Sequence, residues 1–109
     1  MGITDMSTMQ KTMHVLTEAG VRPDVITAFI ATWAICFATR GINTKEEFNQ
    51  EFDKLSCGDI CFSTYLGNDL ATHMKLNFFN YIEYLFDYGM ADSFNIDKPD
   101  INSYIQINT

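Results

Sequence analysis

The sequence has few basic residues. Its 7 lysines and arginines stand against 14 aspartates and glutamates, which gives a formal net charge of −7. Proteins bind the phosphates of DNA and RNA mainly by neutralising them with Lys and Arg, so we expect no direct nucleic-acid binding. A protein partner with a basic surface fits this chain better. The acidic excess is not uniform along the chain. Residues 1–42 hold as many bases as acids, so the whole excess lies downstream.

Cysteine and arginine are also rare. The three cysteines, Cys36, Cys57 and Cys61, cannot all pair within one chain, and no secretory signal is recognised before them. We therefore expect free thiols and a cytoplasmic location. The preference for Ile, Asn, Phe and Lys over Arg is typical of low-GC coding sequences, which favours a viral or phage source and hence the host cytoplasm.

The chain lacks a long apolar run. Its longest uncharged stretch, residues 25–39, contains 15 residues. A helix of that length falls short of the roughly 30 Å hydrocarbon core of a bilayer. We expect this stretch to be a buried helix, with no membrane partner.

Motifs of known catalytic chemistry are missing as well. The chain contains no nucleophile elbow, no phosphate-cradling glycine loop and no His-Glu-x-x-His motif. Cys57, Cys61 and His73 have the side chains that zinc prefers, but closed zinc sites need four ligands. A thiol nucleophile paired with His14 or His73 is the weakest of the open hypotheses. We expect a protein that is not an enzyme and has no catalytic residues, metal or cofactor.

The residues that are plentiful predict a folded all-α domain. Hydrophobic residues make up 47% and aromatic residues 14% of the chain, the opposite of the composition of disordered chains. Apolar residues recur at helical spacing between glycines, which commonly end helices. The predicted compact bundle has four to five helices, at residues 8–19, 24–40, 44–57 and 69–88, with a short apolar element at 59–66.

Local signals set the expected helix boundaries. Ser7 with Gln10 and Thr44 with Glu47 have the spacing of capping boxes, which satisfy free backbone groups at a helix start. Gly89 is predicted to end the longest helix. We therefore expect a helical domain over residues 1–91, followed over 92–109 by an acidic turn region and an extended tail that packs on the domain or on a partner.

The tail shows a different periodicity. Ile101, Ile105 and Ile107 would share one face of a strand, although no other convincing strand in the chain offers a partner. One interpretation is a strand that adds to the sheet edge of a partner or of a second copy. The alternative is a terminus that covers the core.

The acidic excess gathers near the carboxyl end. Glu83 and Asp87 lie four residues apart near the predicted end of the long helix, where they repel each other and oppose the helix dipole. A site that breaks local rules without compensation is a place to look for function. The predicted partner-binding residues are the following acids and tail isoleucines: Glu83, Asp87, Asp92, Asp97, Asp100, Ile101, Ile105 and Ile107.

Two non-enzymatic functions are compatible with these features. The favoured one is a non-enzymatic regulator or inhibitor whose acidic carboxyl-terminal surface binds a basic site on a protein, with nucleic-acid mimicry as its most specific form. The alternative is an assembly subunit that forms a homo-oligomer through apolar helix faces. The alternative to a binding role for the acids is a solvated surface that keeps the protein soluble.

Overall fold

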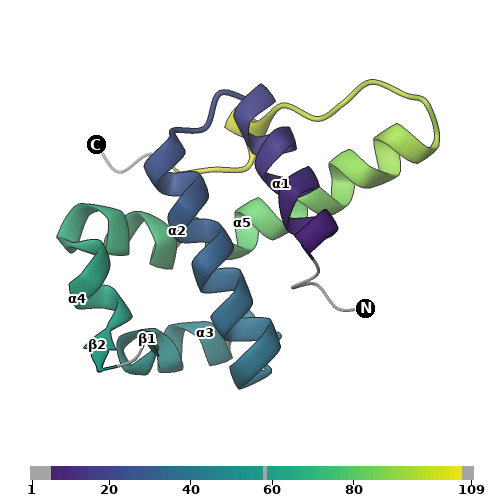
Figure 1. The fold of residues 1–109 in the computed structure, drawn as a ribbon. Helices are drawn as coiled ribbons and strands as arrows, with labels where there is room; N and C mark the ends of the chain where they lie inside the picture. The colour runs from purple at the N-terminus through teal and green to yellow at the C-terminus, as the bar shows by residue number, and fades with distance from the viewer. Residues whose placement is uncertain (1–5, 58, 107–109) are drawn as a thin grey trace.

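Helices make up nearly all of the regular structure. The computed structural model describes residues 6–57 and 59–106 (Figure 1). Its main elements are α1 (Met6–Glu18), α2 (Pro23–Trp33) with the π-helical continuation η1 (Ala34–Arg40), α3 (Lys45–Glu51), α4 (Phe62–Leu66) and α5 (Asn68–Ser93). The short elements are the turn η2 (Phe52–Lys54), the antiparallel strands β1 (Ser56–Cys57) and β2 (Ile60–Cys61), and the turn η3 (Ile101–Ser103). The predicted all-α class is confirmed.

The helix α5 organises the packing. α2 packs on α1 and on α5, while α3 and α4 also contact α5. The last turns of α5 extend beyond the other helices, and the chain then returns in an extended tail toward the end of α1 (Figure 1). This arrangement covers the first part of α5 more completely than its carboxyl end.

An aromatic cluster forms the centre of the core. Phe78 of α5 stacks on Phe48 of α3, with ring centroids 4.5 Å apart and planes inclined by 4°. The same ring lies 5.5 Å from Phe29 of α2 and 6.3 Å from Phe37 of η1. The predicted apolar stripe of α2 and the predicted seam of α5 therefore meet in the core.

The predicted boundaries of the first three helices are correct in part. Thr44 caps α3 by accepting a hydrogen bond of 3.1 Å from the backbone N–H of Glu47, as predicted. Ser7, in contrast, lies inside α1 and is not its cap. The third helix is shorter than predicted, because α3 ends at Glu51 and the chain passes through η2 into the strand hairpin before residue 62. The predicted second helix is continuous, but its last seven residues are π-helical.

The stop at Gly89 was predicted wrongly. α5 continues to Ser93, and the residue that ends it is Asn95, which adopts a left-handed φ of 55°. Ile96 N–H donates to the Ala91 carbonyl at 3.0 Å, and Asn95 N–H donates to the Asp92 carbonyl at 3.2 Å. These two bonds form a Schellman motif, for which Asn is the usual substitute for Gly.

Gly89 is therefore an interior helix residue, and its replacement tests the boundary. A Cβ atom added there meets nothing within 4 Å, and glycine in an exposed helix costs about 1 kcal/mol relative to alanine. We expect Gly89→Ala to raise the free energy of unfolding by about 0.5–1 kcal/mol, measured by urea denaturation. Gly67→Ala is the control: it should lower the free energy of unfolding, because Gly67 has a φ of +83°. A loss of stability in Gly89→Ala would contradict the continuous helix.

The tail is extended, but residues 101–106 do not form the predicted strand. Residues 101–103 form the 3₁₀ turn η3, and Ile105 N–H donates to the Ile101 carbonyl at 3.3 Å. The period-two alternation of the isoleucines is broken by this turn. Ile101 is buried and Ile105 is half-buried against the core, whereas Ile107 lies outside the described residues.

Candidate functional site

The structure divides the predicted acidic residues between different environments. Glu83 is exposed, and Asp87 is half-buried on the same side of α5. Asp92 lies in the last turn, on the other side of the helix, and pairs with Lys98 at 3.3 Å. Asp97 is exposed in the loop, and Asp100 accepts a 3.1 Å hydrogen bond from the Asn102 backbone N–H at the start of η3. The five acids therefore do not form one row.

The helix dipole acts on Asp92 and not on the two predicted acids, Glu83 and Asp87. Because α5 ends at Ser93, Glu83 and Asp87 lie more than a turn before its end, where the dipole has little effect. Asp92 is in the unfavourable last turn, and its ion pair with Lys98 compensates it. The ammonium group of Lys98 also lies 5.7 Å from the centre of the Tyr88 ring.

Exposed apolar side chains accompany Glu83 and Asp87. Phe86 and Phe94 are 67% and 66% exposed, and Met90 between them is 45% exposed. The numbering 83, 86, 87, 90 and 94 follows the three- and four-residue steps that bring side chains to one side of a helix. We call the surface formed by Glu83, Phe86, Asp87, Met90 and Phe94 the acidic–aromatic face.

The apolar part of this face was not identified from the sequence. Phe86 was assigned to a second packing surface, and Met90 and Phe94 fell beyond the predicted end of the helix. Ile96, just after the helix, is also 61% exposed. The spacing of four between 86, 90 and 94 was the available signal. Clustered exposed apolar residues of this kind mark interaction surfaces, whereas isolated ones carry no such meaning.

The tail borders the acidic–aromatic face. The Tyr104 hydroxyl donates a 2.7 Å hydrogen bond to Oδ2 of Asp87, and this bond is the main reason that the pKa of Tyr104 rises to about 12. The fully buried side chain of Asn77 holds the tail at Gln106, donating to its carbonyl at 2.9 Å and accepting from its N–H at 2.5 Å. These contacts fix the tail on α5.

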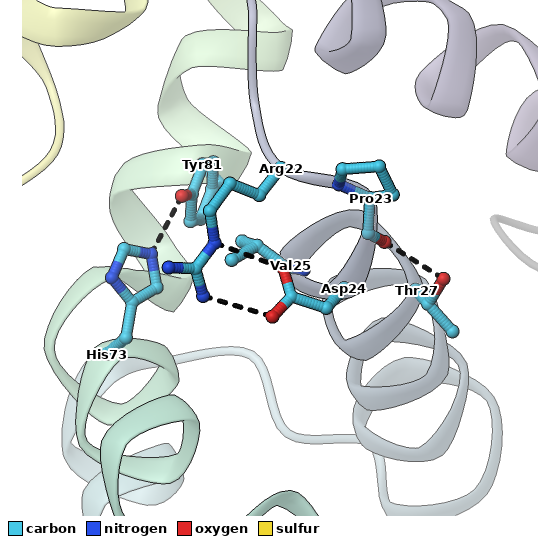
Figure 2. A network of polar contacts seen from close by, with 7 residues as sticks. All are labelled: Arg22, Pro23, Asp24, Val25, Thr27, His73 and Tyr81. Atoms are coloured by element: carbon cyan, nitrogen blue, oxygen red, sulfur yellow. Dashed lines mark hydrogen bonds and ion pairs between the residues drawn. The ribbon is translucent and has the colours of Figure 1, made fainter.

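A cavity of about 530 Å³ lies between the α1–α2 turn, the first half of α5 and the tail. Figure 2 shows the polar network beside it. Arg22 donates to both carboxylate oxygens of Asp24, at 3.1 and 3.0 Å, and His73 Nε2 lies 2.8 Å from the Tyr81 hydroxyl. Apolar side chains such as Leu70 complete the wall. The volume is typical of small-molecule pockets, but these polar groups already bond one another.

His73 makes the stability of the protein depend on pH. Burial lowers the pKa of His73 from 6.5, and the Arg22 charge lowers it further against an opposing effect of Asp24. The unfolded chain therefore takes up this proton more readily than the folded chain. The contribution of neutral His73 to the free energy of unfolding is fully present above about pH 6.5 and is lost as the pH falls below that value.

We expect His73→Gln to lose less stability than the wild type between about pH 7 and pH 5.5, measured by urea denaturation at each pH. The matched control is His14→Gln, because His14 is an exposed residue of α1. Equal pH dependence in the wild type and in His73→Gln would contradict this role of His73.

The contacts described for the two histidines and for Cys61 do not include the thiol–histidine pair that the enzyme hypothesis needs. His73 bonds Tyr81, and His14 lies 4.0 Å from Glu18. Burial raises the pKa of Cys36 to about 12, whereas the Ser63 hydroxyl lowers the pKa of Cys61. Among residues 6–57 and 59–106, no group of three or more His, Cys, Asp or Glu side chains is placed to hold a metal ion.

Comparisons with known proteins do not identify a family for this chain. No known protein family matches the chain, and no curated protein or solved structure is significantly similar to it.

Within the described ranges, no single helix has the length and apolar character to cross a membrane. The bent pair Pro23–Arg40 and Lys45–Lys54 meets both criteria when its two helices are taken together.

Proposed function

We propose that this protein is a non-enzymatic regulator or inhibitor that binds a basic site on another protein through its acidic carboxyl-terminal region. The observation that carries the proposal is that Glu83 and the half-buried Asp87 lie on the same side of α5 as the exposed ring of Phe86, with the exposed ring of Phe94 at the C-cap. A purely solubilising surface needs charges only. Exposed aromatic and methionine side chains are enriched at protein-binding surfaces, and acids beside them add charge complementarity toward a basic partner.

The contacts and the distribution of the five acids limit the proposal in two ways. Asp92 and Asp100 are engaged in contacts within the chain. Glu83 and Asp87 lie beside the exposed rings, so we expect them to contribute most, with Asp87 also accepting the Tyr104 hydroxyl bond. We do not extend the proposal to nucleic-acid mimicry, because mimicry of a duplex requires a regular row of charges and the five acids are divided between several environments.

The apolar surfaces on which the assembly hypothesis rests are used in part inside the chain. Phe29 of α2 and Met74 and Phe78 of α5 are buried, whereas Trp33 and Leu85 are only partly buried. One exposed surface open to a homo-oligomer is the acidic–aromatic face. Two copies meeting there would bring like charges together, which disfavours that arrangement.

The test is capture of a partner from cells that naturally contain the protein. We expect a basic protein to be retained by the wild type and lost from Glu83→Gln/Asp87→Asn, with retention also falling as salt rises from about 50 to about 300 mM. The matched control, Glu46→Gln/Asp53→Asn, removes the same charge from exposed positions near α3 and should keep the partner. Binding that ignores salt, or that survives neutralisation of Glu83, Asp87 and Asp92 together, would overturn the proposal.

A further inference from the structure

We infer that the partner presents an amphipathic α-helix, with a stripe of apolar side chains flanked by Lys or Arg, which packs lengthwise on the acidic–aromatic face. This inference rests on the proposed function, because it names the kind of surface that the acidic region would bind. The apolar stripe would contact Phe86, Met90 and Phe94. The basic side chains would meet Glu83 and Asp87.

The shape of the face supports a helix as the binding element. Phe86, Met90 and Phe94 repeat every four residues, and such rows form the ridges that pack into the grooves of another helix. Eight residues of helix span about 12 Å, which matches two turns of a partner. The carboxyl end of α5 also extends past the other helices, so a second helix can approach it along its length (Figure 1).

The apolar side chains suit this contact in size and flexibility. Each phenylalanine ring can bury on the order of 150–250 Å², so two rings supply a substantial anchor. Met90 lies between them, and the unbranched methionine side chain adapts to the surface of its partner. The ridge therefore offers two rigid contacts with one adjustable contact between them.

The charges beside the row of Phe86, Met90 and Phe94 favour one kind of binding partner over the others. Glu83 is exposed beside the row of Phe86, Met90 and Phe94, and the Asp87 carboxylate accepts the Tyr104 hydroxyl bond. Within residues 6–57 and 59–106, neither acid forms an ion pair with a base. Lys98, the one base of this region, pairs with Asp92 on the other side of α5. A second copy of this chain would bring the same acids to the interface, and an anionic membrane would repel them. A basic helix complements both features.

The inference can be tested with a synthetic helical peptide of about 18 residues, in which leucines form one face and lysines the other. Binding is measured by fluorescence anisotropy on the full chain. A scrambled peptide of the same composition has no apolar face, and a version with glutamates in place of lysines has the opposite charge. We expect the Leu/Lys helix to bind more tightly than either by about tenfold or more.

Variants of the protein identify the surface that is used. We expect Phe86→Ser/Phe94→Ser to weaken binding of the Leu/Lys helix by about tenfold or more. The matched control is Ile60→Ser/Tyr65→Ser, which removes two apolar side chains that are 51% and 67% exposed near α4. It should change the affinity by about twofold or less. Thermal unfolding of each variant confirms that the exposed substitutions leave the fold intact.

Several results would overturn the inference. Equal binding of the scrambled peptide would show attraction by charge alone, and full binding to Phe86→Ser/Phe94→Ser would exclude the ridge. If the partner captured by the wild type is lost from Glu83→Gln/Asp87→Asn but kept by Phe86→Ser/Phe94→Ser, the proposed function survives and this inference fails. A dimer in light scattering that Phe86→Ser/Phe94→Ser dissolves would identify a second copy as the occupant.

Discussion

Replacing Phe78 with alanine is expected to lower the free energy of unfolding by about 4 kcal/mol, because a large aromatic side chain leaves a cavity at the centre of the core. Phe78 is 1% exposed and contacts aromatic rings from α2, η1 and α3. A domain of this size has a total stability of about 5–15 kcal/mol. Chemical denaturation followed by circular dichroism measures the change.

The same helix supplies the control for this prediction. Phe86 lies eight residues further along α5 and is 67% exposed, so Phe86→Ala should change the free energy of unfolding by about 0.5 kcal/mol or less. Where Phe78→Ala is too unstable to purify, Phe78→Leu should still cost about 1–1.5 kcal/mol. Similar costs for Phe78→Ala and Phe86→Ala would contradict the described orientation of α5.

Replacing Asn77 with alanine is expected to lower the free energy of unfolding by about 2–3 kcal/mol, from two lost hydrogen bonds and the cavity left behind. Asn77 is fully buried and bonds both the N–H and the carbonyl of Gln106, 29 residues away in sequence. Amide hydrogen exchange should accelerate at residues 104–106 more than in α2, because the tail loses its fixed point.

Asn80→Ala is the matched control for the tail. Asn80 is half-buried and its side-chain N–H donates a long bond of 3.3 Å to Asn77 Oδ1, so its loss should cost about 1 kcal/mol or less. Equal costs for Asn77→Ala and Asn80→Ala, with unchanged exchange in the tail, would show that Asn77 does not hold the tail on α5.

The sequence predicted most of the fold because its local signals agree with its packing. Thr44 and Glu47 have the spacing of a cap, and they form one. The seam through Met74, Phe78 and Tyr81 predicts a packed helix face, and these side chains are buried. Periodicity and capping depend on neighbouring residues, so they can be inferred from sequence alone.

The wrong predictions fall where a contact between residues distant in sequence, or the backbone conformation of one residue, decides the structure. Gly89 suggested a helix end, but a glycine inside a helix costs only about 1 kcal/mol, and the Schellman motif at Asn95 provides a better end. The isoleucines of the tail suggested a strand, yet Asn77 of α5 binds the backbone of Gln106 and Ile101 is buried against the core. Neither contact can be read from the tail itself.

The candidate site was predicted in part. Glu83 and Asp87 were identified by their charge, and they lie together on α5. Phe86 and Phe94 were missed, because apolar residues at helical spacing usually face the core and the sequence does not show which face the other helices cover. Exposure of these rings is a property of the tertiary arrangement, in which the end of α5 extends beyond α1 and α2 (Figure 1).

We propose the acidic–aromatic face as the surface through which this protein binds a partner. Backbone amide chemical shifts, recorded by NMR with and without the Leu/Lys peptide, show which residues the peptide contacts. We expect the largest changes between residues 83 and 96, with α3 and the cavity lining unaffected. Largest changes around Arg22 and His73, or on α3, would contradict the claim.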